Sequence, residues 1–262
     1  MYNFEMTRPS TIADAVTALK EEDAQALGGG QTLIPTLKQR LAMPSVLVSL
    51  TAIGEMQGVC MSDAGEVCVG GATTHATVAR EATAYPGLAA MAARIGDPAV
   101  RNRGTIGGSL ANNDPSACYP AAALASGASI ITNSREIAAD DYFQGMFTTA
   151  LEEGEVVTEV RFPVPQKSHY EKFVQPASRF ALVGVMVAKY ADGVRVAVTG
   201  ASESGVFRWT EAEAALSANF TSDALGNLSL DGDGMIADLH GSGAYRAHLV
   251  KVMTGRALKA AI

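Results

Sequence analysis

The chain has 262 residues, of which 48% are hydrophobic and 18% charged, with a formal net charge of -7. This length and composition predict a globular protein with more than one domain and a large buried interior. An acidic chain without a run of lysine or arginine is unsuited to nucleic acid. It also has no signal-like start and no apolar run near the ~20 residues of a membrane span. We therefore expect a cytoplasmic protein with no nucleic-acid partner and no membrane span.

The cysteines and histidines are too scattered to suggest a metal centre. Cys60, Cys68 and Cys118 are the only three cysteines, and none belongs to a Cys-x-x-Cys pair. Neither a zinc site nor an iron–sulfur cluster can be built from such spacing. We expect these cysteines to be buried small hydrophobic residues and expect no metal in this chain.

Residues 1–54 alternate helix and strand patterns. "TIADAVTALKEED" (residues 11–23) has apolar residues at helical spacing after a capping Thr11. A short strand in "AQALGG", a helix in "LIPTLKQRLA" and a β-branched strand in "PSVLVSLTAI" follow. These patterns predict a small β-α-β unit.

Residues 55–165 are predicted to form a second unit. Strands are expected in "EVCVGGATT", "ASIITN" and "VVTEVRFPVP", and helices in "THATVAREA", "GLAAMAARI" and "PSACYPAAALAS". Residues 104–114, rich in Gly, Asn and Asp, are expected to be a loop. The prolines at the end of the last strand predict a boundary near residue 165.

Residues 166–262 are predicted to form an α+β domain. "ALVGVMVAKY" and "VRVAVTGAS" read as two strands joined by the turn "ADG". A helix in "TEAEAALS" and a closing helix from Ala244 complete this domain.

Two glycine clusters stand where a phosphate could bind. "GGGQTLIP" (28–35) lies between a strand and a helix, and "GTIGGSLANND" (104–114) precedes another helix. Without a Cβ, unpaired backbone N–H groups at such turns are accessible to a phosphate. The first cluster fits neither of the two common phosphate-binding glycine motifs, and by itself it is better explained as a plain turn. The second could be a solvated turn, but the apolar Ile106 between its glycines argues against that. Together they would clamp the two phosphates of a dinucleotide from opposite sides.

Six motifs in order along the chain carry a family resemblance. They are "GGGQTLIP", "GGATTHATVA", "IGDPAVRNRGTIGGSLANNDP", "EEGEVVTEVRFP", "KFVQPASRFALVGVMVA" and "SGAYRAHLVKVMTGRAL". The chain thereby resembles the FAD-binding medium subunit of the xanthine dehydrogenase and carbon monoxide dehydrogenase family of molybdenum hydroxylases.

The resemblance implies a fold and an activity. The fold is α+β: an FAD-binding region of the PCMH type with two α/β subdomains (1–54 and 55–165), then an α+β domain (166–262) with a small antiparallel sheet. The implied partners are a small subunit with two [2Fe–2S] clusters and a large subunit with molybdenum–pterin, assembled as a dimer of heterotrimers. FAD in this chain would receive electrons from the clusters and pass them to an external acceptor, so no catalytic residue is expected.

The resemblance also implies the residues that bind FAD. Two loops would hold the pyrophosphate: Gly28, Gly29, Gly30, Gln31, Thr32 and Leu33, and Thr105, Ile106, Gly107, Gly108 and Ser109. Arg101 and Arg103 are expected to pin the second loop by salt bridges.

The remaining implied contacts concern the flavin ring and a ribose. Ile95 and Val157 would line the ring pocket, and Lys172 and Phe180 would lie beside the isoalloxazine. Cys118 stands where the family often has an aspartate that accepts hydrogen bonds from a ribose, and a thiol is a poor acceptor. Two outcomes are therefore open: FAD is held less firmly, or Asp114 and Asn112 take over that contact.

Two other functions remain open at this point. One is a self-sufficient FAD-dependent oxidoreductase with its own small-molecule substrate. The other is a binding module without cofactor, in which both glycine clusters are plain turns. The substrate of the complex and its terminal electron acceptor, whether NAD, oxygen or a quinone, are not encoded in any motif of this chain.

Overall fold

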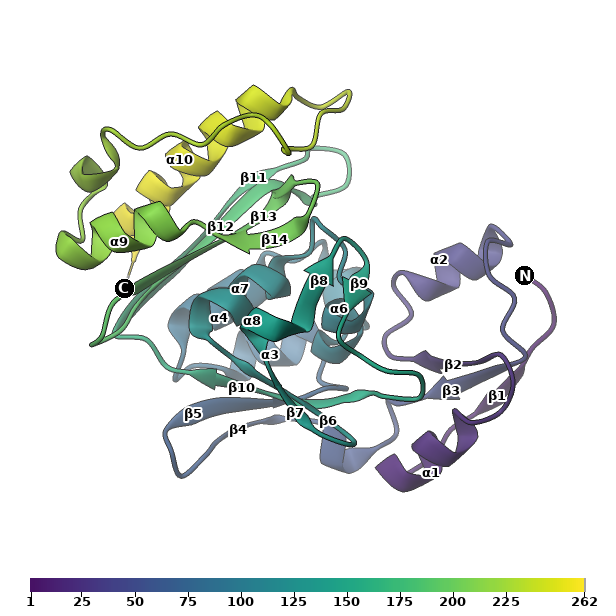
Figure 1. Cartoon of the computed structure of the whole chain (residues 1–262). Helices are drawn as coiled ribbons and strands as arrows, with labels where there is room; N and C mark the ends of the chain where they lie inside the picture. Colours follow the sequence, from purple (N-terminus) through teal and green to yellow (C-terminus); the bar gives the residue numbers. More distant parts are fainter. Residues whose placement is uncertain (262) are drawn as a thin grey trace.

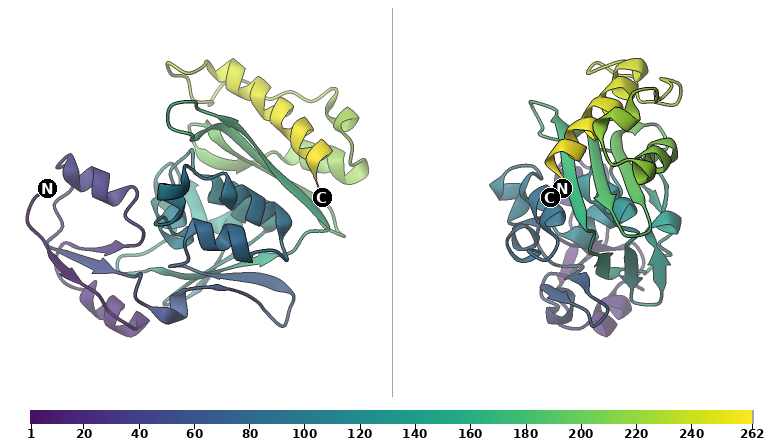
Figure 2. Two further views of the ribbon diagram at one scale, coloured as in Figure 1. Left: turned by 180° about the vertical axis from the view of Figure 1, so that it is seen from behind. Right: turned by 90° about the vertical axis from the view of Figure 1, so that its left-hand side faces the viewer.

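Three main sheets follow one another along the chain in the computed structural model, which describes residues 1–261. The unit built around the first sheet lies at one end of the molecule, and the last two helices lie at the other (Figure 1). The views in Figure 2 show the helices of the middle unit enclosed between the second and third sheets.

The first unit has three short parallel strands. It comprises β1 (Glu5–Thr7), α1 (Ile12–Ala18), β2 (Ala24–Leu27), α2 (Leu33–Lys38) and β3 (Val46–Ser49), with the strand order β1-β3-β2. The predicted cap is confirmed, since Thr11 Oγ1 accepts a hydrogen bond from the Asp14 amide at 3.1 Å. β1 was missed because it is three residues long and largely exposed.

Alternate residues of β3 face the two helices of this unit. Val46 and Val48 pack in one cluster with Ala15 of α1, whereas Leu47 packs in another with Leu37 of α2. Successive side chains of a strand point to opposite faces, so α1 and α2 cover opposite faces of the sheet, as Figure 1 shows. The loop that leads from β2 into α2 is thereby held at one edge of this unit.

The middle unit is an antiparallel sheet covered by helices. Its five strands, in the order β4-β5-β10-β6-β7, are β4 (Val59–Met61), β5 (Glu66–Gly70), β6 (Ser129–Thr132), β7 (Glu136–Ala138) and β10 (Val157–Pro163). The helices are η1 (Gly54–Met56), α3 (His75–Glu81), α4 (Pro86–Ala93), α5 (Pro98–Arg101), α6 (Ile106–Asn112), α7 (Cys118–Ser126) and α8 (Ala139–Tyr142). A small hairpin of β8 (Phe143–Gly145) and β9 (Thr148–Thr149) completes the unit.

Helix α6 corrects the predicted loop over residues 104–114. Thr105 has extended dihedral angles, and its Oγ1 accepts from the Gly108 amide at 3.2 Å, which makes it the N-cap. Two glycines, a serine and an asparagine among its seven residues give α6 a poor intrinsic helix propensity. The helix forms nevertheless, because its first turn is bonded to the end of β5: the Gly107 amide donates to the Gly71 carbonyl at 2.9 Å.

The third unit is a four-stranded antiparallel sheet with both faces covered. Its strands are β11 (Lys167–Val174), β12 (Ala181–Lys189), β13 (Val194–Ser202) and β14 (Gly205–Arg208), in sequence order. Its helices are α9 (Thr210–Ala218), η2 (Ser222–Leu225) and α10 (Gly243–Ala260). The predicted hairpin is confirmed as β12–β13. Strand β11 was missed because Tyr170 is the only apolar side chain among its first six residues.

A shared core joins the second and third units. Tyr170, Met186 and Ala197 of the third sheet belong to the same cluster as Leu88 of α4 and Leu124 of α7. The opposite face of that sheet packs against α9 and α10 in a separate cluster. Burial on both faces explains why β12 reads as an unbroken apolar run. The division of the chain at residues 54 and 165 stays a prediction.

Two further observations concern the sequence predictions. Cys68 and Cys118 are buried as expected, but Cys60 is exposed, because it lies on the edge strand β4. No helix within residues 1–261 is long and apolar enough to cross a membrane.

Candidate functional site

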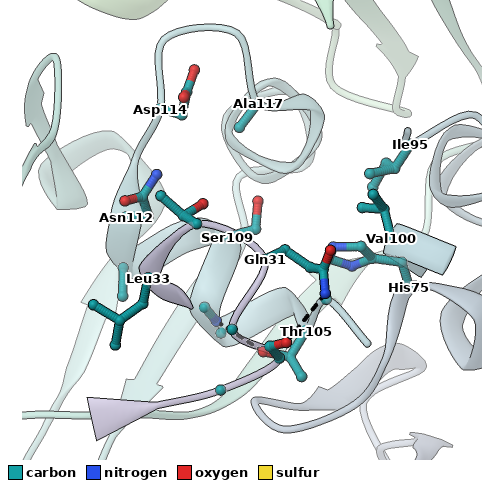
Figure 3. A pocket seen from close by; sticks show the side chains of 18 of the residues that line it. Gln31, Leu33, His75, Ile95, Val100, Thr105, Ser109, Asn112, Asp114 and Ala117 are labelled. Atoms are coloured by element: carbon teal, nitrogen blue, oxygen red, sulfur yellow. Dashed lines mark hydrogen bonds between the residues drawn. The ribbon is translucent and has the colours of Figure 1, made fainter. Parts of the chain in front are cut away.

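A cavity of about 670 Å³ is lined by all three units. The loop between β2 and α2 comes from the first unit, α6 and its flanks from the second, and Lys172 and Phe180 from the third. The volume falls within the ~300–1,000 Å³ typical of small-molecule and cofactor sites. Figure 3 shows Ile95, Val100 and His75 on one side of this cavity and Asn112 and Asp114 on another.

The first glycine loop offers a row of free backbone donors. Across residues 1–261, none of the N–H groups from Gly28 to Leu33 has a hydrogen-bond partner. The loop reverses at Gly30, whose φ of +72° suits glycine. All six residues line the cavity. Successive unpaired N–H groups in such a turn form an anion-binding concavity.

The second glycine loop does not offer the free backbone N–H groups that the sequence analysis expected. The backbone N–H groups of residues 106–109 are already bonded. Ile106 donates to the Thr73 carbonyl at 3.1 Å, Gly107 to the Gly71 carbonyl at 2.9 Å, Gly108 to the Thr105 hydroxyl at 3.2 Å, and Ser109 to the Thr105 carbonyl at 3.0 Å. The sequence interpretation of free amides at this loop was therefore wrong. Its glycines serve close packing, since a Cβ on Gly107 would come within 2.6 Å of the Gly71 carbonyl oxygen.

The two loops lie side by side rather than on opposite sides of a ligand. A Cβ on Gly28 would approach Thr105 Oγ1 to 2.7 Å, and one on Gly29 would overlap the Arg103 carbonyl. Thr105, Gly107, Gly108 and Ser109 line the cavity, but the Ile106 side chain is fully buried in the core and does not. The sequence analysis correctly predicted that both loops lie at one site. It was wrong in expecting them on opposite sides of the ligand.

The Arg101 side chain makes hydrogen bonds to backbone carbonyls and, within residues 1–261, no ion pair. Its Nη1 donates to the carbonyls of Ile95 at 2.9 Å and Gly96 at 3.2 Å. No salt bridge of Arg101 or Arg103 occurs in the described part of the chain. The salt bridges expected of Arg101 are thus replaced by carbonyl hydrogen bonds, which hold the turn between α4 and α5.

The other end of the cavity contains a buried lysine. Lys172 is 5% exposed, and its Nζ donates to the Arg94 carbonyl at 3.2 Å and lies 3.6 Å from Cys118 Sγ. No carboxylate of residues 1–261 pairs with it. Ile95, Val157 and Phe180 also line the cavity, and Phe180 is 51% exposed.

Asn112 and Asp114 line the cavity near the start of α7. Asp114 Oδ1 accepts a hydrogen bond from the Ser116 amide at 2.8 Å, which leaves its second oxygen available. Asn113, which lies between these two residues in the sequence, does not line the cavity and has a structural role. It has a left-handed φ of 43°, and its Nδ2 donates to the carbonyls of Gly145 and Thr148 at 2.8 and 2.9 Å, anchoring the β8–β9 hairpin.

Two cavity residues with strongly shifted pKa values, His75 and Glu155, were not among the predicted site residues. Burial, together with the positive charge of Arg101, lowers the pKa of His75 to about 4. The pKa of Glu155 is lowered to about 2, chiefly by the Arg135 guanidinium and also by hydrogen bonds from Thr132, Ser134 and the Glu152 amide. The sequence did contain one indication for His75, because it directly follows Thr74, the N-cap of α3. No sequence pattern pointed to Glu155.

The charged side chains that line the cavity balance one another. Asp114 and Glu155 are acidic, and Lys172 and Arg179 are basic. Attraction for an anion therefore depends on local donors rather than on net charge, and the free N–H groups of residues 28–33 are the densest set of such donors.

Comparison with known proteins defines the class of this site. Residues 2–165 match the family described as the FAD binding domain in molybdopterin dehydrogenase. The matched segment contains both glycine loops, Asn112 and Asp114. The chain is thus a flavin-binding protein.

Curated relatives agree over almost the whole length. The chain is 34% identical to the carbon monoxide dehydrogenase medium chain of Afipia carboxidovorans, covering 99% of this chain and 96% of that protein. It is 34% identical to the nicotine 6-hydroxylase medium subunit of Paenarthrobacter nicotinovorans (95% and 94% covered). It is 32% identical to the glyceraldehyde dehydrogenase medium chain of Sulfolobus acidocaldarius (98% and 97%).

Solved structures show the same fold. The reconstituted CO dehydrogenase from Oligotropha carboxidovorans superimposes with a TM-score of 0.88 at 31% identity, covering 98% of this chain and 97% of that one. Quinoline 2-oxidoreductase from Pseudomonas putida 86 gives 0.88 at 28% identity, with 99% and 96% covered. The chain belongs to the family of FAD-binding medium subunits of multi-subunit molybdenum hydroxylases.

This membership confirms the predicted family, the α+β fold with its C-terminal antiparallel sheet, and the class of oxidoreductase subunit. It also decides against the two alternatives. A self-sufficient flavoprotein and a cofactor-free module both lack support from relatives that match end to end as medium chains or subunits.

Proposed function

We propose that this chain binds FAD in the 670 Å³ cavity and transfers electrons from two [2Fe–2S] clusters of a small partner subunit to an external acceptor. A large partner subunit would hold the molybdenum–pterin, in a dimer of heterotrimers located in the cytoplasm. The observation that carries the proposal is the row of unpaired N–H groups from Gly28 to Leu33, which opens onto this cavity.

The residues present fit FAD at its diphosphate end. A diphosphate needs several donors in a small volume, and the first loop supplies them from the backbone without any cation. The second loop supports this arrangement by packing against the first, with the Thr105 hydroxyl beside Gly28. Ser109 and Gly108 line the cavity from α6. We propose that the first loop binds the phosphates and that the second positions it.

The residues also fit FAD at its ring end. Bound FAD supplies the one- and two-electron exchange that no side chain of this cavity can perform. Ile95 and Val157, which line the cavity, would give the ring apolar contacts, and Phe180 would pack against it. The Lys172 ammonium, without a carboxylate partner, would stabilise negative charge on the ring. Asp114 and Asn112 would bind a ribose hydroxyl group.

A substitution in the first loop that adds a negative charge at an exposed side chain tests the proposal without disturbing the core. Gln31 is exposed, and its side chain makes one hydrogen bond, of 3.4 Å, to the Gly29 carbonyl. Gln31→Glu places a negative charge among the free N–H groups and should weaken FAD binding by at least about tenfold, or ~1.4 kcal/mol. The readout is the dissociation constant of FAD for the flavin-free protein, measured by flavin fluorescence.

The matched control makes the same change at the other end of α2. Gln39 is exposed, caps the C-terminus of that helix and does not line the cavity. Gln39→Glu should leave the dissociation constant of FAD within about twofold of wild type. Equal FAD affinity in wild type and Gln31→Glu would refute the assignment of the first loop.

The partner assignment needs a separate experiment. Tagged chain isolated from its own cells should bring along two further polypeptides, with iron, acid-labile sulfide and molybdenum in the purified complex. A chain that binds FAD but is recovered alone, without metal, would contradict the proposed partners and leave the flavin site intact.

A further inference from the structure

His75 is a buried polar residue in the cavity wall that the proposed FAD contacts do not include. It is the first residue of α3, and its backbone N–H donates to the Gly104 carbonyl at 2.9 Å. Its side chain is 5% exposed and lines the cavity together with Ile95 and Val100, as Figure 3 shows. The start of α3 is thereby tied to the turn that precedes the second glycine loop.

The His75 imidazole is packed against Gly104 and the Tyr119 ring. A Cβ on Gly104 would come within 2.5 Å of His75 Nε2, so a side chain at residue 104 would displace the ring. The Tyr119 ring packs against the imidazole with centroids 5.3 Å apart and planes tilted by 45°. Gly104 also lies against the first loop, since a Cβ on Gly29 would come 2.6 Å from the Gly104 Cα. His75 therefore lies next to the point where the two glycine loops meet.

This imidazole has no hydrogen-bond partner within residues 1–261. Its Nδ1 is buried and unpaired, and no side-chain hydrogen bond reaches either ring nitrogen. Buried polar groups of native proteins are nearly always paired, with protein, water or a ligand. Nδ1 is fully enclosed by protein, whereas Nε2 is also unpaired but not fully enclosed, so Nε2 is the ring nitrogen that a molecule in the cavity can pair with.

The protonation state decides what the ring offers to that molecule. Because burial and Arg101 lower its pKa to about 4, the imidazole is neutral near pH 7, with one N–H and one bare nitrogen. Burying an unpaired N–H is costlier than burying an unpaired acceptor, which favours the bare nitrogen at the enclosed Nδ1. The proton then resides on Nε2, the nitrogen next to Gly104.

We propose that His75 is an FAD-binding residue whose neutral imidazole donates a hydrogen bond from Nε2 to an oxygen of the FAD diphosphate. This inference rests on the proposed function. It assigns to the diphosphate a donor from the middle unit, in addition to the backbone donors of the first loop. His75 and Gly104 together would set the position of the diphosphate relative to α3.

Binding of two probes by the flavin-free protein tests the assignment. FAD contains the diphosphate and the ring, whereas ADP contains the diphosphate without the ring. His75→Leu should weaken both FAD and ADP by about 10- to 100-fold, the range expected when a hydrogen bond to a charged group is lost. His75→Gln retains an N–H near the Nε2 position and should recover most of the affinity, whereas His75→Asn, whose amide reaches only the Nδ1 position, should not.

The control variant is His248→Leu, on the exposed face of α10, which should bind both probes as wild type does. Weaker binding of FAD with unchanged binding of ADP in His75→Leu would place the contact at the ring and overturn the proposal. Equal binding of both probes by His75→Leu and wild type would overturn it as well. Wild-type protein that binds neither probe would instead refute the proposed function.

A measurement on the wild-type protein covers the case in which the variants fail to fold. Nitrogen-15 NMR of labelled histidine should show His75 as the Nε2-protonated neutral form near pH 7. Its Nε2 proton should shift downfield when ADP is added. An Nδ1-protonated or doubly protonated ring, or a resonance that does not respond to ADP, would overturn the proposal.

Discussion

Gly107 gives the sharpest test of how the second glycine loop works. It lines the cavity, yet its amide is bonded to the Gly71 carbonyl at 2.9 Å, and an added Cβ would come within 2.6 Å of that oxygen. The sequence alone suggested that Gly107 leaves space for a phosphate. The structure indicates instead that it lets α6 approach the end of β5, so that a side chain here would damage the protein even without FAD.

The expected cost of Gly107→Ala follows from these contacts. The obstructing atoms belong to the backbone of Gly71, so no side-chain rotation relieves the overlap. Overpacking costs about 1–3 kcal/mol, and the strained hydrogen bond about 1 kcal/mol. Alanine recovers up to about 1 kcal/mol through its helix propensity. The net loss in the free energy of unfolding is therefore about 1–3 kcal/mol.

Gly108→Ala is the matched control, one residue further along the same helix. A Cβ on Gly108 meets only the Thr105 hydroxyl, at 3.0 Å. Disturbing this N-cap costs about 1 kcal/mol, and the higher helix propensity of alanine returns a similar amount. Gly108→Ala should therefore unfold within about 1 kcal/mol of wild type.

The assay is urea unfolding of the flavin-free proteins, followed by circular dichroism, with the FAD dissociation constant measured in parallel. Gly107→Ala should have a lower unfolding midpoint than both wild type and Gly108→Ala at an unchanged m-value. If Gly107→Ala unfolds at the wild-type midpoint but binds FAD poorly, our reasoning is refuted, and Gly107 contacts the phosphate after all.

Three other changes test the remaining parts of the site. Cys118→Asp would place a carboxylate beside the Lys172 ammonium, 3.6 Å from the present sulfur, and should leave the affinity for oxidised FAD, whose ring is neutral, unchanged or improve it; a marked loss of that affinity counts against this geometry. Phe180→Ala should leave unfolding of the flavin-free protein within about 0.5 kcal/mol, because this side chain is 51% exposed, but should weaken FAD severalfold in a fluorescence titration. Because the pKa of Glu155 is about 2 in the folded protein, against an ordinary value of 4.5, its stabilising effect is complete above that ordinary value and is lost as the pH falls toward 2. Wild type and the exposed control Glu153→Gln should therefore lose more stability between about pH 6 and pH 3 than Glu155→Gln, as measured by urea midpoints at each pH.

Local patterns predicted the elements that depend on neighbouring residues. Thr11 caps α1 as expected, and the apolar runs of β3, β12 and β13 are buried strands. β11 was missed because two of its three buried positions, Ser168 and Lys172, are polar, so the segment shows no apolar pattern. Its length becomes apparent only when it pairs with β12. Pairing between strands is a long-range interaction that a single segment does not encode.

By itself, the sequence determined the family, through six ordered motifs, and the segments from which the cavity is built. Only the tertiary structure decided how these segments work. Residues Ile106–Asn112 form a helix, and the first N–H groups of that helix donate to carbonyls of the protein itself. The N–H groups of Gly28–Leu33 have no such partner within residues 1–261 and stay free to bind a ligand. The tertiary structure also buried His75 against Gly104 without a partner. A glycine permits both a close backbone contact and a phosphate contact, and which of the two occurs depends on the distant residues that reach it.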